Sequence, residues 1–178
     1  MKLPSEGKQK ILRLKAEIER ETEQLERLEQ ELMGLQERLD VAEPSVYDIR
    51  AAGSILHDFY NGVESIFRRI AHELNGGLPV SLDWHKQLLI DMGLGIEGVR
   101  PSVISKELAA KLHNYLGFRH VVRNVYGFFL DAGRVKDLAH ELPEVFAMMR
   151  KEIDHFTTYL ETLANPEEKE KWKREETS

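Results

Sequence analysis

The sequence predicts an all-α fold, and three observations support that prediction. Apolar residues recur at intervals of three and four along most of the chain, as on one face of an α-helix. No segment between two turn signals alternates apolar and polar residues as a half-buried β-strand does. The 178 residues are 42% hydrophobic, which predicts a single domain with a sizeable core over residues 1–165 and a charged tail at 166–178.

The first helix is expected to run from about residue 8 to residue 40 as one long amphipathic rod. Its apolar positions follow a 3-4 spacing that only Glu21 interrupts. Such a stripe packs against neighbouring helices, either of the same bundle or of a second subunit. The stripe consists of Ile11, Leu14, Ile18, Leu25, Leu28, Leu32, Leu35 and Leu39.

Turn-forming residues predict the ends of the second helix. Pro44 disfavours continuation of the first helix, and Ser45 suits an N-cap. An apolar row with helical spacing then continues to the sequence NGG at 75–77, where glycine ends the helix. The following segment LDWHKQLLIDMG predicts a short helix, and LGIEGVRPS predicts a loop.

A third helix is expected from about Ser102 to Leu130, and a last helix over about 133–163. Pro143 should start a new turn of that last helix or bend it. The loop before the third helix contains GLGIEG, which matches G-x-G-x-x-G. A dinucleotide site needs this sequence between a strand and a helix of a βαβ unit, so we interpret it as an interhelical loop.

Composition and residue spacing exclude several kinds of site and of targeting segment. The chain has no cysteine, which excludes disulfides and thiolate metal sites. Neither the start MKLPSEGKQK nor any later segment has the apolar run of a signal peptide or of a membrane helix, so we expect a cytoplasmic protein without membrane contact. The seven histidines show no metal-ligand spacing on one helix face, and we assign no metal and no cofactor.

Positive charge is concentrated in one part of an otherwise acidic chain. The net charge is −6, but residues 100–136 contain seven Lys or Arg against two Asp or Glu. An anion-binding surface is one explanation of this excess. The other is an ordinary solvated helix face that acidic neighbours balance.

The stretch FRHVVRNVYGFFLD, residues 118–131, makes the third helix unusually polar. Arg119 occupies a position in a helical row that is otherwise apolar or aromatic. Because an unpaired buried guanidinium is costly, Arg119 must pair with a carboxylate, face a cleft or lie at a subunit interface. Arg123 follows one turn later on the same side and Tyr126 two turns later. In the simplest alternative, Arg119 pairs with an acid of a neighbouring helix and Tyr126 packs in the core.

The segment RHVVRNVY, Arg119 to Tyr126, resembles the R-x4-H-x-Y signature of HepT-type toxins in the HEPN ribonuclease superfamily. The likeness includes IRAAGSILHDFYNGVESIFRRIAHELNGGLP, DWHKQLL and LAHELPEVF, and covers about residues 8–165. This resemblance implies an up-and-down helical bundle that forms a two-fold homodimer, with the motif helices of both subunits meeting at a cleft. It also implies metal-independent cleavage of RNA, in which the ribose 2′-oxygen attacks the adjacent phosphorus.

The resemblance places Arg119, His120 and Asn124 at the positions of the motif, and these three are the catalytic candidates. Arg123, one turn after Arg119, is a substrate-binding candidate; the alternative is that it contacts only an acidic neighbour. Arginine offers phosphate a permanent charge and forked donors, and histidine moves protons near neutral pH. Asn124 stands where the family has histidine, and an amide can orient a hydroxyl but cannot act as a general base. The nearest proton carrier is then His120, four residues back on the same face. If nothing replaces the histidine, the chain is an inactive HEPN module that binds RNA or protein.

The resemblance also implies a protein partner. HepT-type toxins are typically encoded beside an MNT-type nucleotidyltransferase antitoxin, which neutralises them by complex formation or by adding a nucleotide to the motif tyrosine. Tyr126 matches that tyrosine, and adenylate attached there would place a phosphodiester in the anion cleft beside Arg119. A third interpretation is a helical interaction protein that works through its first helix. The sequence gives no role to Trp84 and His85.

Overall fold

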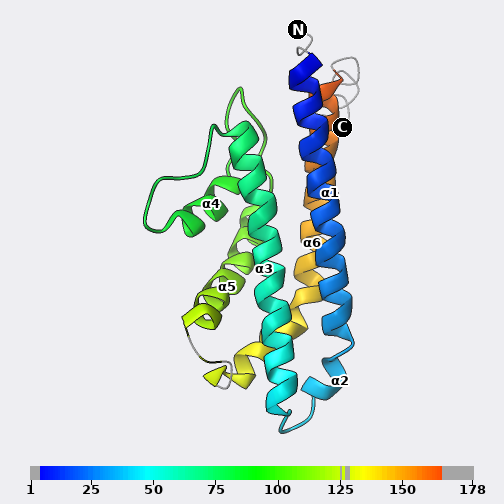
Figure 1. The fold of residues 1–178 in the computed structure, drawn as a ribbon, viewed down its shortest axis with the longest axis vertical. Coiled ribbons are helices and arrows are strands. Elements are labelled where there is room, and N and C mark those ends of the chain that lie inside the picture. The colour runs from blue at the N-terminus through cyan, green and yellow to red at the C-terminus, as the bar shows by residue number, and fades with distance from the viewer. Residues whose placement is uncertain (1–4, 125, 127–128, 166–178) are drawn as a thin grey trace.

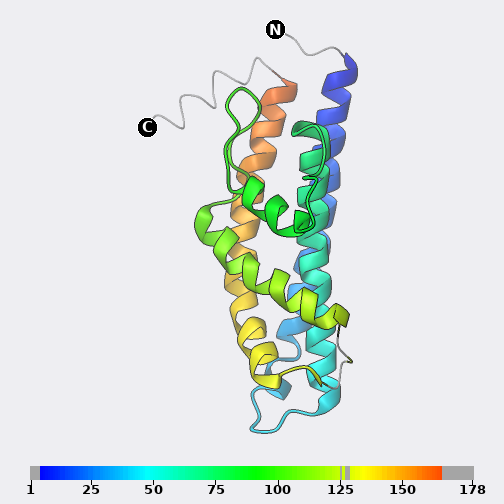
Figure 2. The ribbon, with the colours of Figure 1, turned by 90° about the vertical axis from the view of Figure 1, so that its left-hand side faces the viewer.

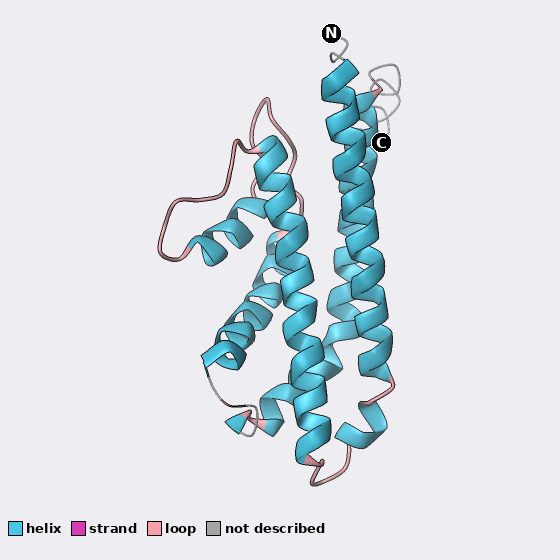
Figure 3. Cartoon of the chain, viewed as in Figure 1, coloured by secondary structure: helices cyan, strands magenta, loops and turns pink. Residues whose placement is uncertain are grey.

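The computed structural model describes residues 5–124, 126 and 129–165. Within these ranges the chain forms helices and loops, with no β-strand beyond an isolated bridge between Ile96 and Arg100 (Figure 3). The predicted all-α fold is confirmed. The helices are α1 (Ser5–Met33), α2 (Gln36–Leu39), α3 (Val46–Leu74), α4 (Trp84–Met92), α5 (Lys106–Asn124) and α6 (Ala132–Ala164), as Figure 1 shows.

The four longer helices α1, α3, α5 and α6 alternate in direction, which makes the fold an up-and-down bundle (Figure 1). Helix α1 packs against both α3 and α6. Helix α5 crosses α3 and α6, and the short α4 packs against α3 and α5 (Figure 2). The apolar stripe of α1 is buried within this bundle, since Leu14, Ile18, Leu25 and Leu32 are each at most 1% exposed.

Both predicted ends of the second helix are confirmed in α3. The side chain of Ser45 accepts a hydrogen bond from the backbone N–H of Asp48 at 3.1 Å, which is N-cap geometry. The helix ends at Leu74 with Asn75 as its C-cap, and Gly76 follows with a φ of 78°, a conformation that glycine adopts without strain. The loop predicted between Gly93 and Ser102 is also present, after α4.

The prediction of one continuous first helix over residues 8–40 is wrong. Helix α1 ends at Met33, a turn follows at Gly34 and Leu35, and α2 begins at Gln36. Glycine disfavours the helix interior by about 1 kcal/mol relative to alanine, which locates the break. The 3-4 apolar spacing continues across the break, and Leu39 of α2 still reaches the core with no exposed surface.

The predicted limits of the third helix are also wrong at both ends. Helix α5 begins at Lys106 because Ser105, rather than Ser102, caps it: its hydroxyl accepts a hydrogen bond from the backbone N–H of Leu108 at 3.1 Å. The helix ends at Asn124, whose side-chain amide donates back to the His120 carbonyl at 2.7 Å. Side-chain bonds of this kind compete with the helical ladder.

Pro143 lies inside α6 and does not end it, and the first turns of that helix lean away from the rest (Figure 1). Proline has no N–H, so the carbonyl of Ala139 loses its partner four residues later. Gln36 of α2 replaces that partner, since its side-chain amide donates to the Ala139 carbonyl at 3.0 Å. The buried hydroxyl of Tyr115 donates to the adjacent Leu138 carbonyl at 3.0 Å. Helices α2 and α5 are therefore both bonded to the bend of α6.

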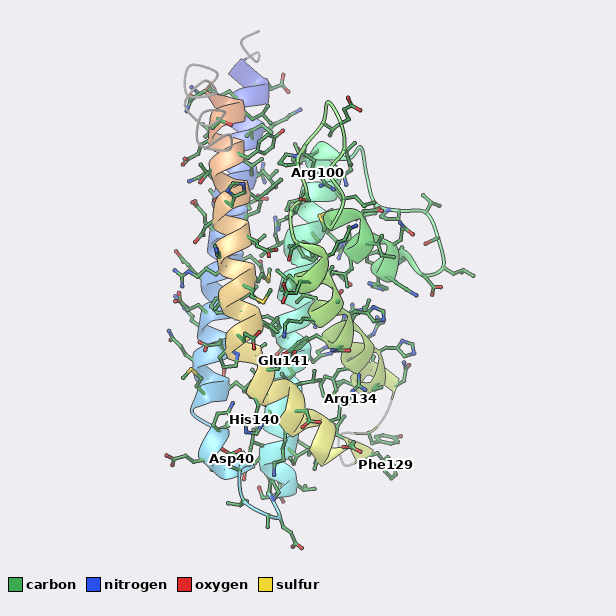
Figure 4. The ribbon with its side chains drawn as sticks, turned by 180° about the vertical axis from the view of Figure 1, so that it is seen from behind. Asp40, Arg100, Phe129, Arg134, His140 and Glu141 are labelled. Carbon is green, nitrogen blue, oxygen red and sulfur yellow. The ribbon has the colours of Figure 1, made fainter. Side chains whose placement is uncertain are left out.

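Arg100 fastens the loop after α4 to two helix ends. Its side chain is 3% exposed, and it donates to Asn75 Oδ1, at the end of α3, at 2.8 Å and to the Asp91 carbonyl, near the end of α4, at 3.0 Å. Burial lowers its pKa. Figure 4 shows Arg100 near the upper end of α3. Among the helices of the described residues, none is long and apolar enough to cross a bilayer.

We predict that the Gln36 contact matters because of Pro143. Gln36→Ala should lower the free energy of unfolding by about 1 kcal/mol, since the Ala139 carbonyl loses a partner. In a Pro143→Ala background, residue 143 regains an N–H for that carbonyl, so Gln36→Ala should cost measurably less. Urea denaturation of the four proteins measures both values, with Gln24→Ala on the exposed face of α1 as control. Equal losses in both backgrounds would contradict this account.

Candidate functional site

A cleft of about 390 Å³ lies between α5 and the start of α4. Cationic and imidazole side chains dominate its wall, and Asp83 is the one carboxylate among the described residues that line it. Four of the five predicted site residues contribute to this wall, so the cleft joins most of the predicted site. The cationic and imidazole residues are His85, Lys86, His113, Arg119, His120 and Arg123, with Asn124 beside them.

Arg119 is both paired with a carboxylate and open to the cleft. Its side chain is only 12% exposed. Nε donates to Asn61 Oδ1 at 2.6 Å, and Nη2 lies 3.4 Å from Glu64 Oε1, so two nitrogens are held by α3. Within the described part of the chain, Nη1 has no hydrogen-bond partner. The guanidinium is thus fixed in place with donors left for an anion.

Glu64 also binds the first turn of α4. Its second carboxylate oxygen, Oε2, lies 2.6 Å from Nδ1 of His85, and the Glu64 side chain is 6% exposed. The ring of Trp84 stacks on the His85 ring, with 3.6 Å between the ring centres. Arg68 lies over the indole, its Cζ 5.7 Å from the ring centre. One buried carboxylate therefore joins α3 to both walls of the cleft.

His120, Arg123 and Asn124 lie on the exposed side of α5. The Asn124 amide, besides its bond to the His120 carbonyl, is 3.3 Å from His120 Nε2. Arg123 makes no ion pair with any described residue, so the alternative in which it only neutralises an acidic neighbour gains no support from those residues. The amide of Asn124 is bonded within its own helix, while Arg123 is open to solvent.

Tyr126 lies beyond the end of α5 and is 73% exposed. It is not among the described residues that line the cleft. The alternative in which Tyr126 packs its ring in the core of this chain is therefore wrong. The extended helical row that placed Tyr126 above Arg119 required α5 to continue, and α5 stops two residues earlier.

The positive excess in residues 100–136 does not form one surface. Arg100 is buried against carbonyls, and Lys111 pairs with Glu141 and Glu144 of α6 at 3.0 and 3.3 Å. Arg134 lies at the start of α6 (Figure 4) and bonds the Asn114 carbonyl. Part of the excess is therefore balanced locally, as the second explanation expects, whereas Arg119 and Arg123 line the cleft, and anion binding there stays a prediction.

A polar row on α3 was not recognised in the sequence. His57, Asn61, Glu64 and Arg68 follow the spacing 4, 3, 4, which places them on one helix face beside the apolar row. That spacing was the signal from which a polar face on this helix could have been predicted. The partners of the row on α4 and α5 are 16 to 58 residues away, so the pairing itself is a tertiary feature.

His57 belongs to this row and is close to the arginines of α5. Its Nδ1 is buried, and no described residue gives it a hydrogen bond. Burial lowers the pKa of His57 below its ordinary value of 6.5; the charge of Asp58 opposes this shift. The positive charges of Arg119 and Arg123 lower the pKa further. Folding therefore favours the neutral imidazole.

Comparison with known proteins gives one family. Residues 51–160 match the family model described as HepT-like protein. No curated protein and no solved structure matches the chain. Among the described residues there is no group of three or more His, Cys, Asp or Glu side chains that could hold a metal ion.

We predict that His57 makes stability depend on pH on the acid side. Because its pKa is lowered in the folded chain, the unfolded chain binds a proton more readily below about pH 6.5, and the free energy of unfolding should fall as pH drops. His57→Gln removes this proton site, so its loss of stability between pH 7 and pH 5 should be smaller. Urea denaturation at both pH values measures the difference, and parallel losses in the two proteins would refute the assignment.

Proposed function

The chain belongs to the HepT-like family of the HEPN superfamily, and on that premise we propose that it is a ribonuclease of a toxin–antitoxin system. The observation that carries the proposal is the state of Arg119 in the cleft. Its guanidinium is held at two nitrogens by α3, while Nη1 has no partner among the described residues. Arg123, His120 and Lys86 lie around the same hollow. A phosphodiester is the anion that such a fork of donors fits.

The proposed reaction is metal-independent cleavage of RNA by its own ribose 2′-oxygen. Arg119 and Arg123 bind the phosphate and stabilise the charge that develops on its oxygens in the transition state. The Asn124 amide orients a ribose hydroxyl or holds a phosphate oxygen, and a histidine of the cleft exchanges protons with the substrate, for which His120 is the candidate on α5 itself. A wall in which cations outnumber carboxylates attracts the polyanionic substrate.

We propose that the working form is a two-fold homodimer in which the clefts of two copies meet. Large apolar side chains are exposed at the end of α5 and just after it, where Val121 is 39%, Tyr126 73% and Phe129 68% exposed. Exposed apolar residues in one region favour an interface. A two-fold axis there would double the arginines at a single locus.

A nucleotidyltransferase antitoxin of the MNT type is the proposed partner, with Tyr126 as the residue that receives adenylate. The exposure of Tyr126 supports this, because a modifying enzyme must reach the hydroxyl. Tyr126 also lies only two residues after Asn124 of the cleft, so an attached phosphodiester could compete with the RNA phosphate for Arg119.

The second candidate function is binding of RNA or protein without catalysis. The bond between the Asn124 amide and the His120 carbonyl favours it, because the group in the family's histidine position has a structural partner here. The third interpretation, an interaction protein that works through its first helix, loses its basis. The apolar stripe of α1 is used inside the bundle of the same chain.

We predict that the purified chain cleaves single-stranded RNA in the presence of a chelator. Arg119→Ala should reduce the initial rate by about 10²-fold or more, since an oriented donor to the transition state is lost. Arg20→Ala, an exposed arginine of α1, is the matched control and should keep the rate. An oligonucleotide with 2′-deoxyribose at the cut position should resist cleavage.

Each outcome separates the candidate functions. Retained cleavage by Arg119→Ala would contradict the proposed site. An inert chain that still binds RNA, and that gains cleavage on Asn124→His, would establish the binding module instead. Gel analysis of the RNA and fluorescence anisotropy of labelled RNA give the two readouts.

We predict that incubation with an MNT-type antitoxin and ATP adds adenylate to Tyr126. Intact-mass spectrometry should show the added mass in the unaltered chain and none in Tyr126→Phe, whereas Tyr47→Phe, an exposed tyrosine 78% accessible at the start of α3, should be modified like the unaltered chain. Modification of Tyr126→Phe at an undiminished level would place the acceptor elsewhere.

A further inference from the structure

The proposed cleavage needs a group that takes the proton of the ribose 2′-hydroxyl. Asn124 cannot do so, and its amide is bonded to the His120 carbonyl. Three histidines line the cleft among the described residues: His85, His113 and His120. Of these, His85 alone contacts a carboxylate, and that carboxylate is the one that holds Arg119.

The contact with Glu64 fixes the tautomer of His85. A carboxylate accepts hydrogen bonds, so in neutral imidazole the proton lies on Nδ1, 2.6 Å from Glu64 Oε2. Nε2 is then the acceptor, and within the described ranges it has no protein partner. A carboxylate behind an imidazole also stabilises the positive charge that appears when Nε2 takes a proton.

Two further contacts fix the ring itself. Trp84 covers one face of the imidazole at 3.6 Å between ring centres, and Arg68 lies over the indole. Helix α4, which carries both rings in its first turn, is anchored at its other end, where Arg100 bonds the Asp91 carbonyl. His120 lacks such support, since its ring is on the exposed side of α5 and its Nε2 is next to an amide.

We propose that His85 is the general base of RNA cleavage in this chain and that Glu64 is its positioning residue, an inference that rests on the proposed function. His85 Nε2 takes the proton of the 2′-hydroxyl, and the 2′-oxygen forms a bond to phosphorus. The bond between phosphorus and the 5′-oxygen breaks, and the leaving oxygen takes a proton from solvent. His85 returns its proton to solvent, so the products are a 2′,3′-cyclic phosphate and a 5′-hydroxyl.

Glu64 links this step to binding of the phosphate. The same carboxylate contacts Arg119 through Oε1 and His85 through Oε2, so the phosphate donor and the base are held at a fixed separation. Holding two reacting groups in one geometry is a large part of enzymatic rate enhancement. His85 is thus the proton carrier that the R-x4-H-x-Y pattern lacks in this sequence, supplied from another helix.

The test compares initial cleavage rates on a defined single-stranded RNA oligonucleotide. His85→Ala should lower the rate by about 10²-fold or more while the Kd for RNA changes little. Added imidazole should restore part of the rate, and substituted imidazoles should restore more as their pKa rises. His85→Gln keeps a hydrogen-bond donor for Glu64 and should be equally slow. His140→Ala, which removes a histidine bonded to Asp40 on the far side of α6 (Figure 4), is the control and should keep the rate.

The outcomes distinguish this inference from the proposed function. If the unaltered chain is inert, or if Arg119→Ala cleaves normally, both fail. A second outcome is that the unaltered chain cleaves RNA, Arg119→Ala does not, and both His85→Ala and His85→Gln keep their rates. His85 is then not the base, and only this inference fails. A loss of rate in His120→Ala that imidazole rescues, with His85→Ala unaffected, would transfer the role to His120. Nitrogen-15 NMR spectra of the histidine side chains should show the proton of His85 on Nδ1. In Glu64→Ala this preference for Nδ1 should be lost.

Discussion

The cleft depends on one buried carboxylate. Glu64 lies on α3 where α4 and α5 converge, and it contacts Arg119 on one side and His85 on the other. A carboxylate or a guanidinium buried alone would be strongly unfavourable, and each offsets the cost of the other only if the geometry is held. The interaction therefore does more than stabilise a pair of charges. It fixes the relative position of three helices at the place where a ligand can enter.

The same carboxylate explains why a nearly buried arginine is still available to a ligand. Asn61 and Glu64 occupy Nε and Nη2, which leaves the remaining nitrogen of Arg119 without a partner among the described residues. A fully neutralised guanidinium would offer little to phosphate, and a solvated one would not be oriented. Arg119 is between these limits, and the exposed Arg123 next to it adds charge without fixed geometry.

The sequence predicted most of the helices but not where two of them end. Helical periodicity and the Ser45 cap were local signals, and α3 and α6 follow them closely. The break at Gly34 was hidden because the 3-4 spacing continues through it, and α5 ends at Asn124, whose side chain bonds the His120 carbonyl. Periodicity records which residues face the core, and it does not record where the backbone turns.

The candidate site was predictable where its residues share one helix. Arg119, His120, Arg123 and Asn124 come together through the spacing of α5 alone. His85 and Glu64 come from two other helices, and a lone His or a lone Glu in a helix carries no signal of its partner. The excess of positive charge in residues 100–136 was an incomplete guide to the site for the same reason. Its lysines and arginines are neighbours in the sequence but lie apart in the folded chain.

The double contact of Glu64 has a consequence for how this chain can diverge in evolution. A substitution at position 64 removes a partner from two functional groups at once, whereas a substitution at position 124 removes bonds to His120 and changes one part of the cleft wall. On the proposed chemistry, Glu64, His85 and Arg119 act together, so a substitution of any one of them should impair the function of the other two. Asn124 makes no hydrogen bond with any of these three residues among the described ranges, so a substitution there changes the wall of the cleft and leaves the contacts of Glu64 in place.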